Sequence, residues 1–234
     1  MTVFFKKLLL GSSPSMKPVS AIGSRIKNIK AIWNNAHDND LGIEKLFRLF
    51  LAASPFFFLG LYIKQIAGKR GHAYQDLAVD FFILLKVFFP FALIYWELGH
   101  SKILFAILIW FMAETILYVP TLVFASDSLA RPRSYRRSML MLFFNYIEII
   151  LDFSVIYSLN NFLNQPFKAW YDPIYFSFTT SASIGFGDFF PVTGMGKFIV
   201  SCQSIIFLMF VVVFLNFFSA KVVTRGYFDD SKES

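Results

Sequence analysis

The chain contains few of the residues on which soluble enzymes and disulfide-rich domains depend. Its 234 residues include one cysteine, Cys202, and three histidines, so there is no disulfide framework and no CxxC metal motif. Charged residues make up only 16% of the chain and hydrophobic residues 56%, whereas soluble domains are about a quarter charged. A chain of this size cannot bury so much apolar surface in one soluble core. We therefore expect much of it to face lipid.

Catalytic and nucleotide-binding motifs are also absent from the sequence. It has no GxxxxGKS/T, HExxH or GxSxG pattern, and hence no phosphate loop, zinc-protease helix or nucleophile elbow. We expect neither enzymatic activity nor a cofactor. The net charge of +7 could indicate nucleic acid, but the basic residues flank hydrophobic segments, where they orient a protein in the membrane. No nucleic-acid partner is therefore expected.

Four hydrophobic segments are long enough to cross a bilayer, which requires about 20 mostly apolar residues. They are residues 77–97, 103–125, 139–159 and 198–220, and the last of them carries no charge. This pattern predicts an all-α membrane protein with four transmembrane helices. The region 77–125 then holds two accessory helices that precede the others.

The distribution of lysine and arginine predicts the orientation of these helices. If residues 1–48, 64–76, 126–138 and 221–234 are cytoplasmic, they contain 18 of the 22 basic residues. Because basic loops stay on the cytoplasmic side, both termini are expected there, with 221–234 as a short cytosolic tail. The expected location is the plasma membrane.

The N-terminal residues 1–45 are predicted to form a basic, partly ordered cytosolic arm. Several of its apolar and basic residues recur at helical spacing: Arg25, Ile26, Lys27, Ile29, Lys30, Ile32 and Trp33. This spacing is typical of a basic amphipathic helix that lies on anionic lipid head groups. A solvated arm is the alternative.

Residues 46–63 are apolar but are interrupted at Ser54 and Pro55, where proline removes a backbone donor and clashes with the preceding turn. A complete crossing in this segment would move the lysine-rich N-terminus to the outside. We therefore expect an interfacial or re-entrant helix here, with a fifth span as the alternative.

Charged residues inside the predicted spans need partners, because an unpaired charge costs several kcal/mol in a bilayer. Glu148 and Asp152 are four residues apart and share one face of the third span, and Lys86 lies inside the first. We expect an ion pair with Lys86 or hydrogen bonds to neighbouring helices, and a cation vestibule or proton-sensitive switch is the alternative. No span has a basic residue at every third position, so a voltage sensor is not expected.

A short helix and a glycine-containing segment follow the third span. Asp172 and Pro173 predict a helix start. The carboxylate can accept hydrogen bonds from the free amides of the first turn, and the N–H that proline lacks would have no partner within the helix at this position. About ten residues later the apolar pattern ends in Ser-Ile-Gly-Phe-Gly-Asp, residues 183–188. Such a helix rises about 15 Å, half a bilayer, so the chain must turn back.

The two alternate glycines of this segment permit dihedral angles that point successive carbonyls to one side. Four such strands around an axis form rings of oxygens that replace the water around a potassium ion. The order of segments over residues 139–220, with SIGFGDFFPVT at 183–193, resembles the potassium-channel pore domain: outer helix, pore helix, filter and inner helix.

This resemblance implies a role for each matching residue. The filter would comprise Ser183, Ile184, Gly185, Phe186 and Gly187, with Asp188 at the outer mouth. K+ would be held by the carbonyls of the first four residues and by the Ser183 hydroxyl. Thr179 and Thr180 would lie in the pore helix. The candidates for lining the inner cavity are Leu208, Val211, Leu215 and Asn216.

The chain departs from the family pattern at several positions. Ser183 replaces the usual threonine, Phe186 replaces a tyrosine whose hydroxyl can tie the filter to the pore helix, and Thr179 stands where some relatives have a buried acid. Residues 197–225 contain no glycine, so a hinge within the inner helix is not supported.

The function expected from the sequence is a potassium-selective channel that conducts K+ passively through a homotetramer, because the sequence contains one filter motif. Intrinsic voltage gating is not expected. The alternatives are a weakly selective cation channel of the same architecture, the membrane subunit of a potassium transporter, and a membrane scaffold that binds partners through residues 76–126.

Overall fold

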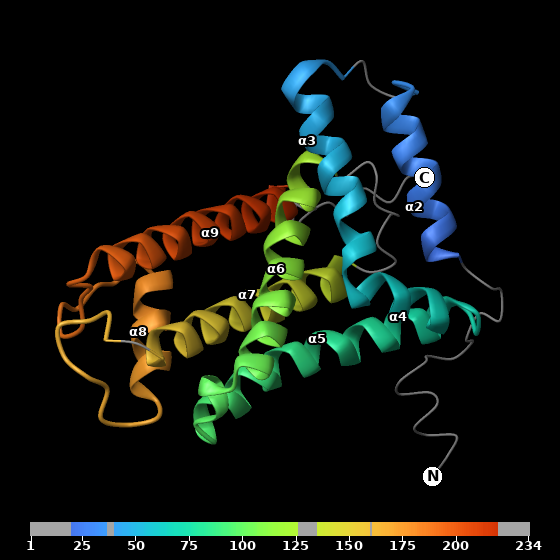
Figure 1. Ribbon diagram of the computed structural model, residues 1–234. Helices are drawn as coiled ribbons and strands as arrows, with labels where there is room; N and C mark the ends of the chain where they lie inside the picture. The colour runs from blue at the N-terminus through green and yellow to red at the C-terminus, as the bar shows by residue number, and fades with distance from the viewer. Residues whose placement is uncertain (1–19, 37–39, 126–134, 160, 220–234) are drawn as a thin grey trace, which may run out of the picture.

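The computed structural model describes residues 20–36, 40–125, 135–159 and 161–219, and their regular structure is helical. An isolated antiparallel bridge joins Leu163 to Pro191. The prediction of an all-α membrane protein is confirmed. The elements in chain order are α2 (Ala21–Trp33), α3 (Gly42–Ala53), η1 (Ser54–Phe57), α4 (Leu59–Gly68), α5 (His72–Tyr95), η2 (Leu98–His100), α6 (Lys102–Phe124), α7 (Tyr135–Ser158), α8 (Asp172–Ser181) and α9 (Gly194–Ser219) (Figure 1).

Helices α5, α6, α7 and α9 are long and apolar enough to cross a membrane, as the sequence predicts. Three of them begin four or five residues before the predicted spans, because polar residues at the membrane surface continue the helix beyond its apolar part. Pro90 and Pro120 lie inside α5 and α6 without ending them, as membrane helices often allow. In Figure 1, the axes of α5, α7 and α9 are similarly inclined, with α9 running opposite to the other two, and α6 runs steeply across them.

The segment predicted at 46–63 is a bent pair of helices. The chain breaks at η1, which contains Ser54 and Pro55 as expected, and turns by 69° between the helices on either side. The predicted bounds were too narrow, because α3 already begins at Gly42, inside the region assigned to the N-terminal arm, and α4 continues to Gly68. A bent pair of this kind is either a broken span or a re-entrant loop, the two alternatives raised by the sequence.

The helix predicted within the N-terminal arm is present as α2. It begins at Ala21, before the apolar repeat, because the Ser20 hydroxyl accepts a hydrogen bond from the Gly23 amide at 3.0 Å and caps the helix. The Ile22 amide donates to the Gln65 side chain at 3.0 Å, which holds α2 against α4.

Helix α7 is the central helix of the fold. Over its span 56% of the residues are buried, against 17% for α9. One face of α7, which includes Phe153 and Tyr157, packs in the larger core cluster with Phe176 of α8 and Phe210 of α9. The opposite face packs Val155 between α5 and α6. Helix α7 therefore joins the accessory helices to the C-terminal helices.

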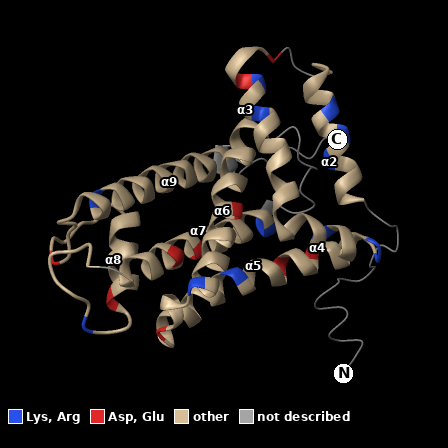
Figure 2. Cartoon of the chain, viewed as in Figure 1, with Lys and Arg blue, Asp and Glu red and all other residues tan. Residues whose placement is uncertain are grey.

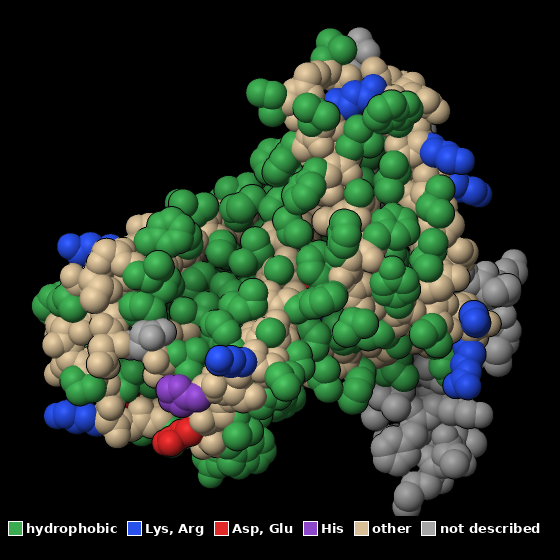
Figure 3. Space-filling view, in the orientation of Figure 1, with side chains coloured by type: hydrophobic (Ala, Val, Ile, Leu, Met, Phe, Trp, Pro, Cys, Tyr) green, Lys and Arg blue, Asp and Glu red, His purple; other side chains and the backbone are tan. Residues whose placement is uncertain are grey.

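The surface of the protein is largely apolar. Figure 3 shows hydrophobic side chains over most of the visible face and lysine and arginine mainly towards its edges. Large exposed side chains occur on each spanning helix, for example Phe81, Trp110, Leu140 and Leu208. An apolar surface of this extent fits contact with lipid or with further subunits.

A buried ion pair links three of the spanning helices. The ammonium of Lys86 on α5 lies 3.0 Å from Glu148 Oε1 on α7, and it also donates to the Thr115 hydroxyl on α6. Thr115 in turn donates to Glu148 Oε2 at 2.9 Å. Figure 2 shows how sparse the charges on these helices are. The predicted pairing with Lys86 is confirmed for Glu148.

Asp152, one turn further along α7, is 1% exposed. Neither of its carboxylate oxygens has a hydrogen-bond partner among the described residues. Lys86 therefore lies near two buried acids and pairs directly with one of them, Glu148, which its removal would leave without a cation.

We predict that Lys86→Met destabilises the detergent-solubilised protein by about 3–5 kcal/mol, because it leaves buried charge unpaired. Lys86→Met combined with Glu148→Gln is expected to recover most of this loss. Thermal unfolding measures both effects, with Lys102→Met, at an exposed position, as the matched control. A single variant as stable as the control would contradict the importance of the ion pair.

Candidate functional site

The short helix α8 has the length that the sequence predicts, with ten residues from Asp172 to Ser181 and Pro173 in its first turn. The predicted role of Asp172 needs correction. Its carboxylate accepts hydrogen bonds from the amides of Lys168 and Ala169, at 2.7 and 2.9 Å, which precede the helix. It therefore folds the preceding loop onto the helix start and does not cap the first turn.

The C-terminus of α8 determines how the glycine segment begins. The Ser183 amide donates to the Thr180 carbonyl at 3.1 Å, and the Ile184 amide donates to the Thr179 carbonyl at 2.9 Å. This pair of bonds is the Schellman motif, whose left-handed position is usually glycine. Here that residue is Ser183, with φ of +56°. Thr179 and Thr180 lie in the last turn of α8, and their carbonyls close the turn.

Left-handed residues alternate along the candidate filter. After Ser183, Gly185 has φ of +58° and Gly187 has φ of +85°, while Ile184 and Phe186 between them do not have positive φ. A Cβ added at either glycine would meet no atom of the chain within 4 Å, so a side chain would not clash within one protomer. Glycine is favoured at both positions because other residues rarely adopt a positive φ. This alternation is the pattern expected to turn successive carbonyls to one side.

The candidate filter lies at the surface of the single chain. Residues 182–188 are all exposed, including Ile184 and Phe186, which are 54% and 68% exposed. Irregular backbone at half-bilayer depth is stable only if it is buried in protein or lines water. In a single chain, this segment would therefore have to face water or a neighbouring protein.

Two side-chain amides hold the end of the candidate filter in place. The Asp188 carbonyl accepts hydrogen bonds from Asn164 Nδ2 and Gln165 Nε2, each at 3.0 Å. Asn164 Oδ1 also accepts from the Phe190 amide at 2.9 Å. These contacts join the loop after α7 to the chain that follows the filter. The sequence contained no signal for them, since both residues lie in a loop without a motif.

Tyr175 of α8 adds a further contact to the outer end of the filter. Its ring stacks on Phe186, with centroids 6.2 Å apart and planes within 7°. Its phenol also lies within interaction range of Asp188. Helix α8 thus places a hydroxyl beside the end of the candidate filter, although Phe186 lacks one.

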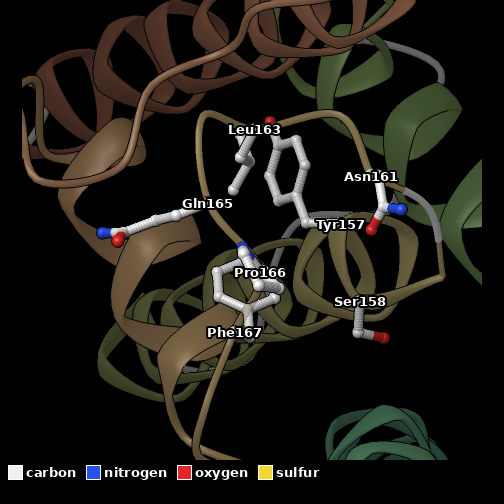
Figure 4. A pocket seen from close by; sticks show the side chains of 7 residues that line it. All are labelled: Tyr157, Ser158, Asn161, Leu163, Gln165, Pro166 and Phe167. Carbon is white, nitrogen blue, oxygen red and sulfur yellow. The ribbon is translucent and has the colours of Figure 1, made fainter.

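A hollow of about 170 Å³ lies beside this region, at the C-terminal end of α7. Figure 4 shows the seven residues that line it, among them Tyr157, Leu163 and Phe167. The Gln165 side chain extends away from the others in this view, and its amide reaches the Asp188 carbonyl. The hollow is formed by α7 and its following loop and contains no filter residue.

The candidate cavity residues lie mostly on the unpacked face of α9. Leu208, Leu215 and Asn216 are exposed, and Val211 is half-buried. The opposite face of the helix, with Phe210 and Val213, is buried against α7 and its neighbours. The structure therefore places three of the four residues where they can face a pore or another subunit.

Comparison with known proteins agrees with this geometry. A family model described as an ion channel matches residues 145–224, which include the second half of α7, α8, the candidate filter and α9. The match supports an ion-channel pore module. It covers about a third of the chain, and the helices before residue 145 lie outside it. Neither the curated proteins nor the solved structures contain a match to this chain.

The left-handed backbone of Ser183 leads to a stability prediction. Ser183→Gly should stabilise the protein by about 1 kcal/mol, because glycine adopts this conformation without the cost of a Cβ. Ser183→Val should destabilise it, because a β-branched residue is a steric outlier at positive φ. Thermal unfolding in detergent measures both variants. Equal melting temperatures for the glycine and valine variants would contradict the assigned conformation.

Proposed function

We propose that four copies of this chain form a potassium-selective channel that conducts K+ passively across the plasma membrane. The observation that carries the proposal is the backbone of residues 183–187, in which left-handed residues alternate directly after a half-bilayer helix. A strand of this kind offers carbonyl oxygens as ligands, and the stretch contains no acidic side chain. Rings of carbonyls suit a monovalent cation that must lose its water and regain it quickly.

The exposure of the pore module supports assembly. Helix α9 is the least buried of the spanning helices, and its exposed face carries Ile205, Leu208, Val212 and Leu215. The filter segment is exposed beside it. Four copies around one axis would cover both surfaces and close the carbonyl rings. The C-terminus of each α8, with its partial negative charge, would then point towards the ion path.

The absence of intrinsic voltage gating is supported by the contacts of two basic residues in the described spans, Lys86 and Arg137. Lys86 is fixed by its contacts with Glu148 and Thr115. Arg137, near the start of α7, is bound to Asp76 and Asp80 of α5. Steep voltage dependence requires several charges per subunit that move through the field, and residues held in this way are not free to do so.

Potassium selectivity depends on the filter backbone, so Gly185→Ala should abolish K+ current while leaving the oligomer intact. The added Cβ opposes φ of +58° at a position where carbonyl geometry must be exact. Gly194→Ala is the matched control, because Gly194 is also exposed, has open space around it and lies at the start of α9 without positive φ. Planar-bilayer recording of purified wild type and both variants measures the effect. Selective current from the Gly185→Ala tetramer would contradict the filter assignment.

A weakly selective cation channel is the second candidate, because Ser183 presents a hydroxyl without the methyl group that restricts the rotamer of threonine. The reversal potential with K+ and Na+ on opposite sides separates the two candidates. A large shift towards the K+ equilibrium potential supports potassium selectivity, and a value near zero supports the weakly selective channel.

The basic residues support an orientation with both termini in the cytoplasm and with the exposed Lys27 and Lys30 of α2 near anionic head groups. In a Cys202→Ser background, Lys168→Cys should react with an impermeant thiol reagent applied to intact cells, and Lys30→Cys should not. Both positions are exposed, so a difference reports sidedness and not burial. External labelling of Lys30→Cys would show that the bent pair α3 and α4 crosses the membrane as a fifth span.

A further inference from the structure

A polar side chain in the middle of α9 is fully buried. Gln203 is 1% exposed and lies on the face of α9 that packs against its own subunit, with the buried Phe210 two turns further along. Most residues around it on this helix are apolar. A buried amide is costly unless its donors and acceptor are paired, so its partners define its role.

The Gln203 amide contacts two other helices. Its Nε2 donates to the Ser177 carbonyl at 3.0 Å, to the Ser177 hydroxyl at 2.8 Å and to the Ser181 hydroxyl at 2.7 Å, all on α8. Two N–H groups serve three acceptors, so the acceptors of Ser177 share one of them. Its Oε1 accepts from the Tyr157 hydroxyl of α7 at 2.6 Å.

The same cluster continues to the backbone of α7. The Ser177 hydroxyl donates to the Ile150 carbonyl at 2.6 Å. Ser177 and Ser181 are 0% and 2% exposed, so water does not replace these bonds. The outer, pore and inner helices of the module are therefore joined by one buried set of hydrogen bonds.

The position of Ser181 gives this cluster a link to the filter. Ser181 is the last residue of α8, and the left-handed Ser183 follows two residues later. The Ser183 and Ile184 amides donate to carbonyls of α8, so the end of that helix directly holds the first two residues of the filter. A displacement of Gln203 would thus move the C-terminal end of α8, which holds Ser183 and Ile184.

We propose that Gln203 is a positioning residue through which the inner helix sets the geometry of the selectivity filter. This inference rests on the proposed function. Helix α9 runs unbroken from Gly194 to Ser219, and the sequence contains no glycine from 197 to 225. A movement of the C-terminal half of α9 is therefore passed along the helix to Gln203, and from there through Ser181 to Ser183.

The test uses variants that each remove one part of the cluster. Ser181→Ala deletes the bond from Gln203 next to the filter, together with the contact between Ser181 and Tyr146 of α7. Tyr157→Phe deletes only the bond between Gln203 and Tyr157. Gln203→Met removes all the bonds of Gln203 while keeping a similar volume. For each purified full-length variant, the permeability ratio of Na+ to K+ and the block by internal Ba²⁺ are measured in planar bilayers, and thermal unfolding is measured in detergent.

Ser181→Ala is expected to raise the permeability ratio and weaken Ba²⁺ block by about five-fold, the change that corresponds to one lost hydrogen bond. Gln203→Met also loses the bonds to Ser177 and Tyr157, and it is expected to shift both quantities in the same direction by at least as much. Tyr157→Phe should lower the melting temperature without changing the permeability ratio or the Ba²⁺ block. A purely structural role would lower the melting temperature of all three variants and leave permeation unchanged. Ser181→Ala, which removes one oxygen, keeps the test decisive if Gln203→Met does not fold.

The outcomes separate this inference from the proposed function. Selective K+ current in the wild type, with unchanged permeability and block in Ser181→Ala, would overturn the role of Gln203 and leave the proposed channel standing. Absence of K+ current in the wild type would overturn the proposed channel and this inference with it.

Discussion

Backbone that is not helical cannot lie at membrane depth unless protein or water satisfies its polar groups. Residues 182–188 violate this condition in the single chain, because they are irregular, apolar in part and exposed. The surrounding structure is organised around this constraint. The Schellman turn at Ser183 holds the first end of this segment, and Asn164, Gln165 and Tyr175 contact its last residues. Neither set of contacts covers the exposed strand itself, which is why assembly is central to the proposed function.

Helix α7 connects the two halves of the fold, the accessory helices and the C-terminal helices. On one face its Glu148 pairs with Lys86 of α5. On the other face the Ile150 carbonyl accepts a hydrogen bond from the Ser177 hydroxyl, and the Tyr157 hydroxyl donates one to Gln203 of α9. The pore module therefore does not stand apart from the accessory helices. The packing of α5 and α6 is thus linked to α8 through the most buried of the spanning helices.

The local elements could be predicted because they depend on short-range physics. Apolar runs of about 20 residues identified the four spans, and the proline at position 55 identified the break in the first segment. The half-length of α8 and the alternate glycines identified the candidate filter. The pairing of Lys86 with Glu148 followed from the cost of unpaired charge in a membrane, although the part played by Thr115 did not.

The sequence by itself determined the membrane class, the order of the helices and the position of the glycine segment, since each follows from hydropathy and backbone freedom within a few residues. Only the tertiary structure decided that Ser183 takes a glycine-like conformation, that Asp172 binds the amides of the preceding loop, and that Gln203 joins three helices. The physical reason is that a hydrogen bond between helices depends on their relative rotation. That rotation is set by the packing of residues far apart in the chain, which no local pattern contains.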